Sequence, residues 1–208
     1  MRTSLYKYIE LFVLFVFIPI SFLFDYAPWV KIFIGFIGLV YVIFVLLKVE
    51  KQKIRIAQNI NWVLFFKTTL GKFFVIIIFT TLFVWLTNKE LLFYVLLNKP
   101  KLWVFILFVY SFFSVYPQEL IFRTFFFKRY EVLFNNSAIL VFVNAFLFAL
   151  AHVLFKNTLV LVLTFLGGLI FAFSYYKMQS TLLVSIEHAI YGSWLFTVGM
   201  GSILGFPS

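Results

Sequence analysis

Long apolar runs, separated only by short polar clusters, are the feature that most limits what this chain can fold into. Of its 208 residues, 64% are hydrophobic and only 12% are charged, a composition far from that of a water-soluble domain. A helix needs about 20 mainly apolar residues to cross a bilayer, and runs close to that length recur along the chain. The sequence therefore predicts an integral membrane protein of the all-α class, folded as a polytopic transmembrane helical bundle.

Hydropathy along the chain indicates about seven spans. They are expected at residues 9–24, 30–47, 73–86, 102–130, 137–155, 159–178 and 182–199. The segment NKELLFYVLLNKP, residues 88–100, is short, contains flanking lysines and ends in a proline, which is typical of an interfacial helix. We expect three regions: transmembrane helices with the interfacial segment over residues 1–101, a core over 102–199 and a C-terminal tail over 200–208.

The net charge of +10 indicates a membrane topology and argues against a nucleic-acid partner. Basic residues cluster between the predicted spans, as the positive-inside rule describes. Eleven of them fall on the side of the N-terminus and five on the other side, so we expect a cytoplasmic N-terminus, in a bacterial inner membrane. The inner set is Arg2, Lys7, Lys48, Lys51, Lys53, Arg55, Lys67, Lys72, Lys128, Arg129 and Lys177, and the outer set is Lys31, Lys89, Lys99, Lys101 and Lys156.

A few ionisable residues lie inside the predicted spans, where each costs about 2.5 to 3.5 kcal/mol or more. Glu119 and Arg123 are in the fourth span, His152 is in the fifth, and Glu187 adjoins His188 in the seventh. Such groups are tolerated where they face the bundle interior and find partners. Because Glu119 and Arg123 are four residues apart, they share one helix face, and the guanidinium can keep the carboxylate ionised and oriented.

Three of these groups are expected at similar depths in the membrane. Counted at about 1.5 Å per residue from the span ends, Glu119, His152 and His188 fall near the middle or the cytoplasmic half, so we expect one shared, hydrated cavity. There they can bind a divalent metal such as zinc and leave a position for water, or they can activate water without a metal. Both alternatives imply hydrolysis. A third interpretation is that these side chains only cross-link helices.

The neighbours of both histidines favour a site. Asn144 and Phe148 precede His152 at four-residue steps, so the three share one stripe of the fifth span. Gly192 follows His188 by four residues and allows close approach of another chain segment. The chain contains no cysteine, which excludes a thiolate metal site and a thiol nucleophile.

Three motifs in this order resemble those of the CPBP family, the CAAX-processing and bacteriocin-processing intramembrane proteases also called Abi proteins. The family carries a Glu-Glu-x-x-x-Arg helix, a Phe-x-x-x-His helix and a later His-x-x-x-Asn helix. They correspond here to QELIFR at 118–123, FALAH at 148–152 and HAIYG at 188–192. The resemblance covers residues 102–199, which makes that core CPBP-like. It implies an α-helical bundle with its site inside the membrane, open toward the cytosol.

The resemblance also implies an activity and its residues. The activity is endopeptidase cleavage of a peptide or membrane-protein substrate at the bilayer, in the manner of prenyl-protein or bacteriocin-leader processing. The catalytic residues are then Gln118, Glu119, Arg123, His152 and His188. If a metal such as zinc is bound, its ligands are Glu119, His152 and His188; otherwise no cofactor is required.

Two positions depart from the family pattern. The first glutamate of the family, usually assigned as the water-activating base, is Gln118 here, and an amide cannot take a proton at neutral pH. The family asparagine, an oxyanion donor, is Gly192, and loss of such a donor costs about 2.7 to 4 kcal/mol of transition-state stabilisation. We expect Glu119 to be the base, or Glu187 if it turns toward the cavity. A non-catalytic pseudoprotease that binds a peptide, lipid or partner protein is the alternative interpretation.

Overall fold

The computed structural model describes residues 3–52 and 60–201, which are helical with no strand among them. In this part of the chain, six helices are long and apolar enough to cross a membrane, which confirms the predicted all-α polytopic bundle. They are Ser4–Ser21, Pro28–Val49, Trp62–Thr87, Pro100–Leu133, Ser137–Phe155 and Thr158–Met178. Some of the sequence predictions lie outside the described residues. They concern three cations assigned to the inner side, Arg2, Lys53 and Arg55, and the tail residues 202–208.

The seventh predicted span also forms a helix, α11 (Thr181–Val198), although it is not among the six. Its apolar residues are interrupted by Glu187, His188 and several hydroxyl-bearing side chains, which lower its mean hydropathy. Residues 88–100 contain only the short helices η3 (Lys89–Leu91) and α5 (Tyr94–Asn98) before α6 begins at Pro100. An eighth span is therefore absent from these described residues, as predicted.

The chain divides into two compact units. The first joins residues 1–56 to 118–179, and the second joins residues 57–117 to 180–208. The division falls between Pro117 and Gln118, inside the span Pro100–Leu133. The first unit thus carries the QELIFR and FALAH motifs, and the second carries HAIYG.

In the first unit, α9 (Ser137–Leu150) packs along α10 (Thr158–Met178). Each helix begins at an asparagine whose side-chain oxygen accepts from backbone N–H groups: Asn136 caps α9 and Asn157 caps α10. The helices approach closely because Gly168 has no side chain. A Cβ atom at Gly168 would lie 3.0 Å from the Cα atom of Ala145, so the glycine serves helix packing here.

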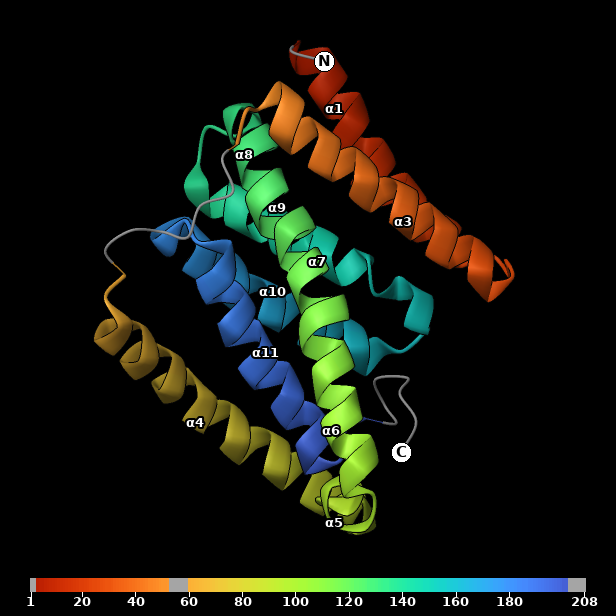
Figure 1. Cartoon of the computed structure of the whole chain (residues 1–208), viewed down its shortest axis with the longest axis vertical. Helices are drawn as coiled ribbons and strands as arrows, with labels where there is room; N and C mark the ends of the chain where they lie inside the picture. The colour runs from red at the N-terminus through yellow and green to blue at the C-terminus, as the bar shows by residue number, and fades with distance from the viewer. Residues whose placement is uncertain (1–2, 53–59, 202–208) are drawn as a thin grey trace. The chain divides into compact units, whose positions relative to one another are not determined.

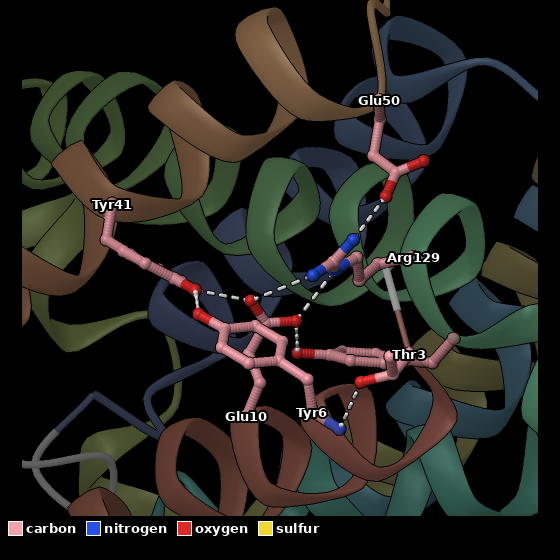
Figure 2. Close-up of polar contacts among 7 residues, drawn as sticks. Thr3, Tyr6, Glu10, Tyr41, Glu50 and Arg129 are labelled. Atoms are coloured by element: carbon pink, nitrogen blue, oxygen red, sulfur yellow. Dashed lines mark hydrogen bonds and ion pairs between the residues drawn. The ribbon is translucent and has the colours of Figure 1, made fainter. Parts of the chain in front are cut away.

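A buried polar cluster joins three further segments of the first unit (Figure 2). Arg129, in α8 (Phe126–Tyr130), donates from Nε to Glu10 Oε2 at 2.7 Å and from Nη1 to Glu50 Oε1 at 2.6 Å. The hydroxyls of Tyr41 and Tyr130 also donate to the Glu10 carboxylate. The cluster connects α1 (Ser4–Phe12), α3 (Pro28–Phe44) and the chain just after η2 (Val45–Val49) to the end of the motif-bearing helix.

This cluster corrects the sequence interpretation of Arg129 as one of the cations between spans. Arg129 is buried, as is Glu10 within the first apolar helix, so its charge is neutralised inside the protein. Lys72 likewise lies inside α4 (Trp62–Thr87), which begins eleven residues before the predicted span at residue 73. The cytoplasmic location of the N-terminus stays a prediction.

Replacing Arg129 with methionine is expected to destabilise the protein by about 3 to 5 kcal/mol, because it leaves the buried Glu10 carboxylate without its cation. The neighbouring Lys128 is exposed, so Lys128→Met serves as the matched control, with an effect within about 0.5 kcal/mol. The measurement is unfolding of the purified protein in detergent, followed by tryptophan fluorescence. Equal stability of the two variants would show that the cluster does not hold α8 in place.

Candidate functional site

The helix that carries the first motif changes its winding on both sides of that motif. After α6 (Pro100–Val109), the π-helical segment η4 (Tyr110–Val115) leads into the single turn α7 (Tyr116–Glu119), and a second π-helical segment, η5 (Leu120–Phe125), follows. Pro117 has no N–H group for an i→i−4 hydrogen bond, and the wider turn before it accommodates that loss. Such π-helical turns are rare and are frequent at functional sites. Gln118 and Glu119 lie on the turn between them.

Glu119 and Arg123 form an ion pair within this helix. Glu119 Oε2 lies 3.3 Å from Arg123 Nε, and neither residue has solvent-exposed surface. The four-residue spacing brings the two groups together, as the sequence predicts. Because a buried charge without its counter-charge costs several kcal/mol, the pair keeps the Glu119 carboxylate near the guanidinium.

Arg123 is in turn fixed by α9. Its Nη1 donates to Asn144 Oδ1 at 2.6 Å, and Asn144 Nδ2 donates to the carbonyl oxygen of Phe122 at 2.5 Å. The guanidinium carbon lies 4.8 Å from the ring centroid of Phe148, which is within the range of a cation–π contact. Two of the three residues on the predicted stripe therefore hold Arg123 in place.

The third residue of the stripe, His152, lies just beyond the end of α9. Its Nδ1 is 2.8 Å from the carbonyl oxygen of Phe148, and the two rings are 4.8 Å apart. A carbonyl oxygen only accepts hydrogen bonds, so Nδ1 carries the proton of this bond, and a neutral ring then has Nε2 as its acceptor. The stripe thus leads from the Glu119–Arg123 pair to a half-buried imidazole with a defined tautomer.

In the second unit, the Glu187 side chain bonds to α4, which lies beside α11 (Figure 1). Its buried carboxylate forms an ion pair with Lys72. The Tyr191 hydroxyl lies 2.9 Å from Glu187 Oε1 and 3.0 Å from the carbonyl oxygen of Thr69, so it can donate to either. These contacts give Glu187 a structural role between α4 and α11 and argue against it as the base.

His188 and Gly192 contact another neighbour in the second unit, Tyr110, at the start of η4. The ring centroids of His188 and Tyr110 are 6.0 Å apart in an edge-to-face arrangement. His188 is buried, with 6% of its surface exposed. The hydroxyl of Tyr191, by contrast, bonds to the carbonyl oxygen of Thr69 in α4. His188 and Tyr191 therefore contact different neighbours, although they are only three residues apart.

A metal centre stays a prediction. Within the described part of each unit, no three or more His, Asp or Glu side chains gather in a way suited to hold an ion. The predicted ligands belong to different units, Glu119 and His152 to the first and His188 to the second. Their convergence in one cavity is likewise a prediction from motif and depth.

Sequence reasoning missed Lys72 and Tyr110 in this region. Lys72 was assigned to the polar cluster before the third span, because Lys67 and Lys72 interrupt the hydropathy there. Tyr110 is one of eleven tyrosines, and only its contact with Gly192, more than 80 positions later in the sequence, distinguishes it. Neither the Lys72–Glu187 ion pair nor the contact between Tyr110 and Gly192 produces a periodic pattern in the sequence.

We expect Asn144→Ala to destabilise the protein by about 1 to 3 kcal/mol, because it removes a partner from both Arg123 and the buried Phe122 carbonyl. Asn98→Ala is the matched control, since Asn98 is exposed and bonds only locally, to the carbonyl of Tyr94. Its expected effect is within about 0.5 kcal/mol. Unfolding in detergent measures both, and a loss no larger for Asn144 than for Asn98 would contradict the proposed network.

Comparison with known families identifies the region that carries these motifs. The Rce1-like family model, described as "Type II CAAX prenyl endopeptidase Rce1-like", matches residues 100–194. The match includes Glu119, Arg123, His152 and His188, and it begins where α6 begins. Searches of curated proteins and of solved structures found no match. Residues 100–194 of this chain therefore match the Rce1-like type II CAAX prenyl endopeptidases, which are part of the CPBP family of intramembrane proteases.

Proposed function

We propose that this chain is an intramembrane endopeptidase that hydrolyses a peptide bond of a membrane-associated substrate, as in prenyl-protein or bacteriocin-leader processing. The family supports a CAAX-type intramembrane protease. The observation that carries the proposal is the buried Glu119–Arg123 pair, which Asn144 and Phe148 connect to His152. We place the protein in a bacterial inner membrane with its N-terminus in the cytoplasm.

Glu119 is the proposed general base. A carboxylate can take a proton from water as the water attacks the scissile carbonyl carbon, and Arg123 keeps this carboxylate in position. His152 presents Nε2 to the water or to the substrate, because its Nδ1 is used by Phe148. His188 is assigned to the polarisation of the carbonyl oxygen on the basis of its motif.

Gln118 occupies the place of the family base but has different chemistry. Its amide can donate to and accept from water, although it cannot hold the proton that water releases. Gln118 lies on the same helical turn as Glu119 and is half-buried, whereas Glu119 is fully buried. We assign water orientation to Gln118 and proton removal to Glu119.

The proposed residues also fit a divalent metal by donor type. One carboxylate and two imidazoles form a ligand set that zinc takes in hydrolytic enzymes. When bound, zinc lowers the pKa of a water molecule and polarises a carbonyl group. The ligands would be Glu119, His152 and His188, while Arg123 remains with Glu119.

A pseudoprotease is the second function, and Gln118 is the observation that favours it. If Glu119 serves only to neutralise Arg123 inside the helix, no base remains in the first motif. The chain would then bind a peptide or lipid without cleaving it. Hydrolysis that appears only after Gln118→Glu would support this function over the first.

The Glu119→Gln variant keeps the size of the side chain and removes the base, so we expect hydrolysis to fall by about 10² to 10⁴-fold. The probe is an internally quenched, farnesylated peptide ending in a Cys-aliphatic-aliphatic-X sequence, in vesicles that contain the purified protein. Glu90→Gln changes an exposed acid in η3 and is the control. Unfolding curves of both variants show whether a loss of activity comes from a loss of the fold. A folded Glu119→Gln variant with full activity would refute the role of Glu119 as the base.

Removal of divalent metal distinguishes the two ways of activating water. If His152 and His188 hold zinc, dialysis against a chelator should abolish hydrolysis, and added zinc should restore it. Apo and zinc-loaded samples should then also differ in thermal stability, because an ion bound to the folded state stabilises it. Full hydrolysis by metal-free protein, verified by elemental analysis, would establish the mechanism without a metal.

A further inference from the structure

A tyrosine hydroxyl occupies the space beside Gly192. A Cβ atom added at Gly192 would lie 1.9 Å from the hydroxyl oxygen of Tyr110 and 2.4 Å from its ring Cζ. These distances are too short for any real side chain, so residue 192 has to be glycine while Tyr110 keeps this position. Both residues belong to the second unit, in which α11 packs against η4 and α6.

The contacts of the Tyr110 ring define where this hydroxyl lies. The ring packs edge-to-face against Phe196, at 4.9 Å between centroids, and against His188, at 6.0 Å. Residues 188, 192 and 196 follow at four-residue steps along one face of α11. The Tyr110 hydroxyl therefore lies one helical turn from His188, where a side chain at residue 192 would otherwise project.

The chemistry of tyrosine matches the group that the family motif places at this position. The side-chain amide of asparagine and the hydroxyl of tyrosine both donate hydrogen bonds, and both serve as donors to developing oxyanions in enzymes. Glycine at residue 192 removes one such donor, and the close approach of Tyr110 brings another to the same place. The donor then comes from η4 and not from α11.

We propose that Tyr110 is the oxyanion donor of this protein, acting beside His188. The inference rests on the proposed endopeptidase function. Water adds to the carbonyl carbon while the base takes its proton, and the C=O π electrons move onto the oxygen. Tyr110 donates a hydrogen bond to that oxygen and keeps its own proton. When the C–N bond breaks, the proton on the base passes to the amine nitrogen, which leaves a carboxylic acid and an amine.

Tyr110→Phe removes the hydroxyl and keeps the ring. We expect kcat toward the farnesylated peptide to fall about 10² to 10³-fold, with KM nearly unchanged, because the hydrogen bond strengthens only as the oxyanion forms. Tyr94→Phe, in α5 of the same unit, is the control and should retain wild-type kcat. Wild-type kcat in the Tyr110→Phe variant would overturn the role of Tyr110 while the proposed endopeptidase function stands.

A donor swap separates chemistry from packing. In a Tyr110→Ala background, Gly192→Asn restores a donor at residue 192, and Gly192→Leu fills similar space without one. We expect asparagine to raise kcat above that of Tyr110→Ala, and leucine to leave it low. Equal recovery by leucine would show that Tyr110 only fills space, which would overturn the inference.

Thermal unfolding tests the geometry without a substrate. Gly192→Ala should lower the Tm when Tyr110 is present and should not lower it in the Tyr110→Ala background. Gly71→Ala in α4 is the control for helical glycine, because a Cβ atom there meets nothing within 4 Å. If the wild-type protein cleaves no peptide, the endopeptidase and the role of Tyr110 in it both fail. The unfolding series would still report whether Tyr110 excludes a side chain from residue 192.

Discussion

Burial of ionised side chains in an apolar helical bundle is the constraint on which the rest of this structure depends. A charge without a partner inside such a bundle costs several kcal/mol, so each buried acid or base requires a counter-charge at a fixed position. Arg129 meets Glu10 across 119 residues of sequence, and Glu187 meets Lys72 across 115. Each pair therefore fixes how two distant helices align within its unit.

The Glu119–Arg123 pair differs from these two in what it joins. It lies within one helix, at a spacing of four residues, so by itself it aligns no second element. Through Arg123 it also reaches Asn144 and Phe148 on α9. The pair thus places a fully buried carboxylate within the first motif, at the position of the proposed base.

The sequence predicts local features of this protein well and distant pairings poorly. The fifth predicted span, residues 137–155, coincides with Ser137–Phe155, and the Glu119–Arg123 contact follows from helical periodicity. In contrast, the acid partners of Arg129, Glu10 and Glu50, lie far from it in the sequence, and neither hydropathy nor spacing identifies them. The same limit explains why α4 begins earlier than predicted. In the sequence, Lys72 interrupts the apolar run and so indicates the start of a span, whereas in the fold it lies inside α4 and neutralises Glu187.

The two departures from the family motif have different meanings once the fold is known. Gly192 alone suggests a lost donor, but the position of Tyr110 shows that glycine and tyrosine depend on each other, because any larger residue at 192 would displace the phenol. A motif compared one position at a time cannot detect such an exchange between helices. Gln118 is followed in its own helix by an acid, Glu119, on the same turn between two π-helical segments. Such π-helical segments are frequent at functional sites, and in the proposed mechanism the base lies one residue further along the helix, whereas the oxyanion donor comes from a different helix.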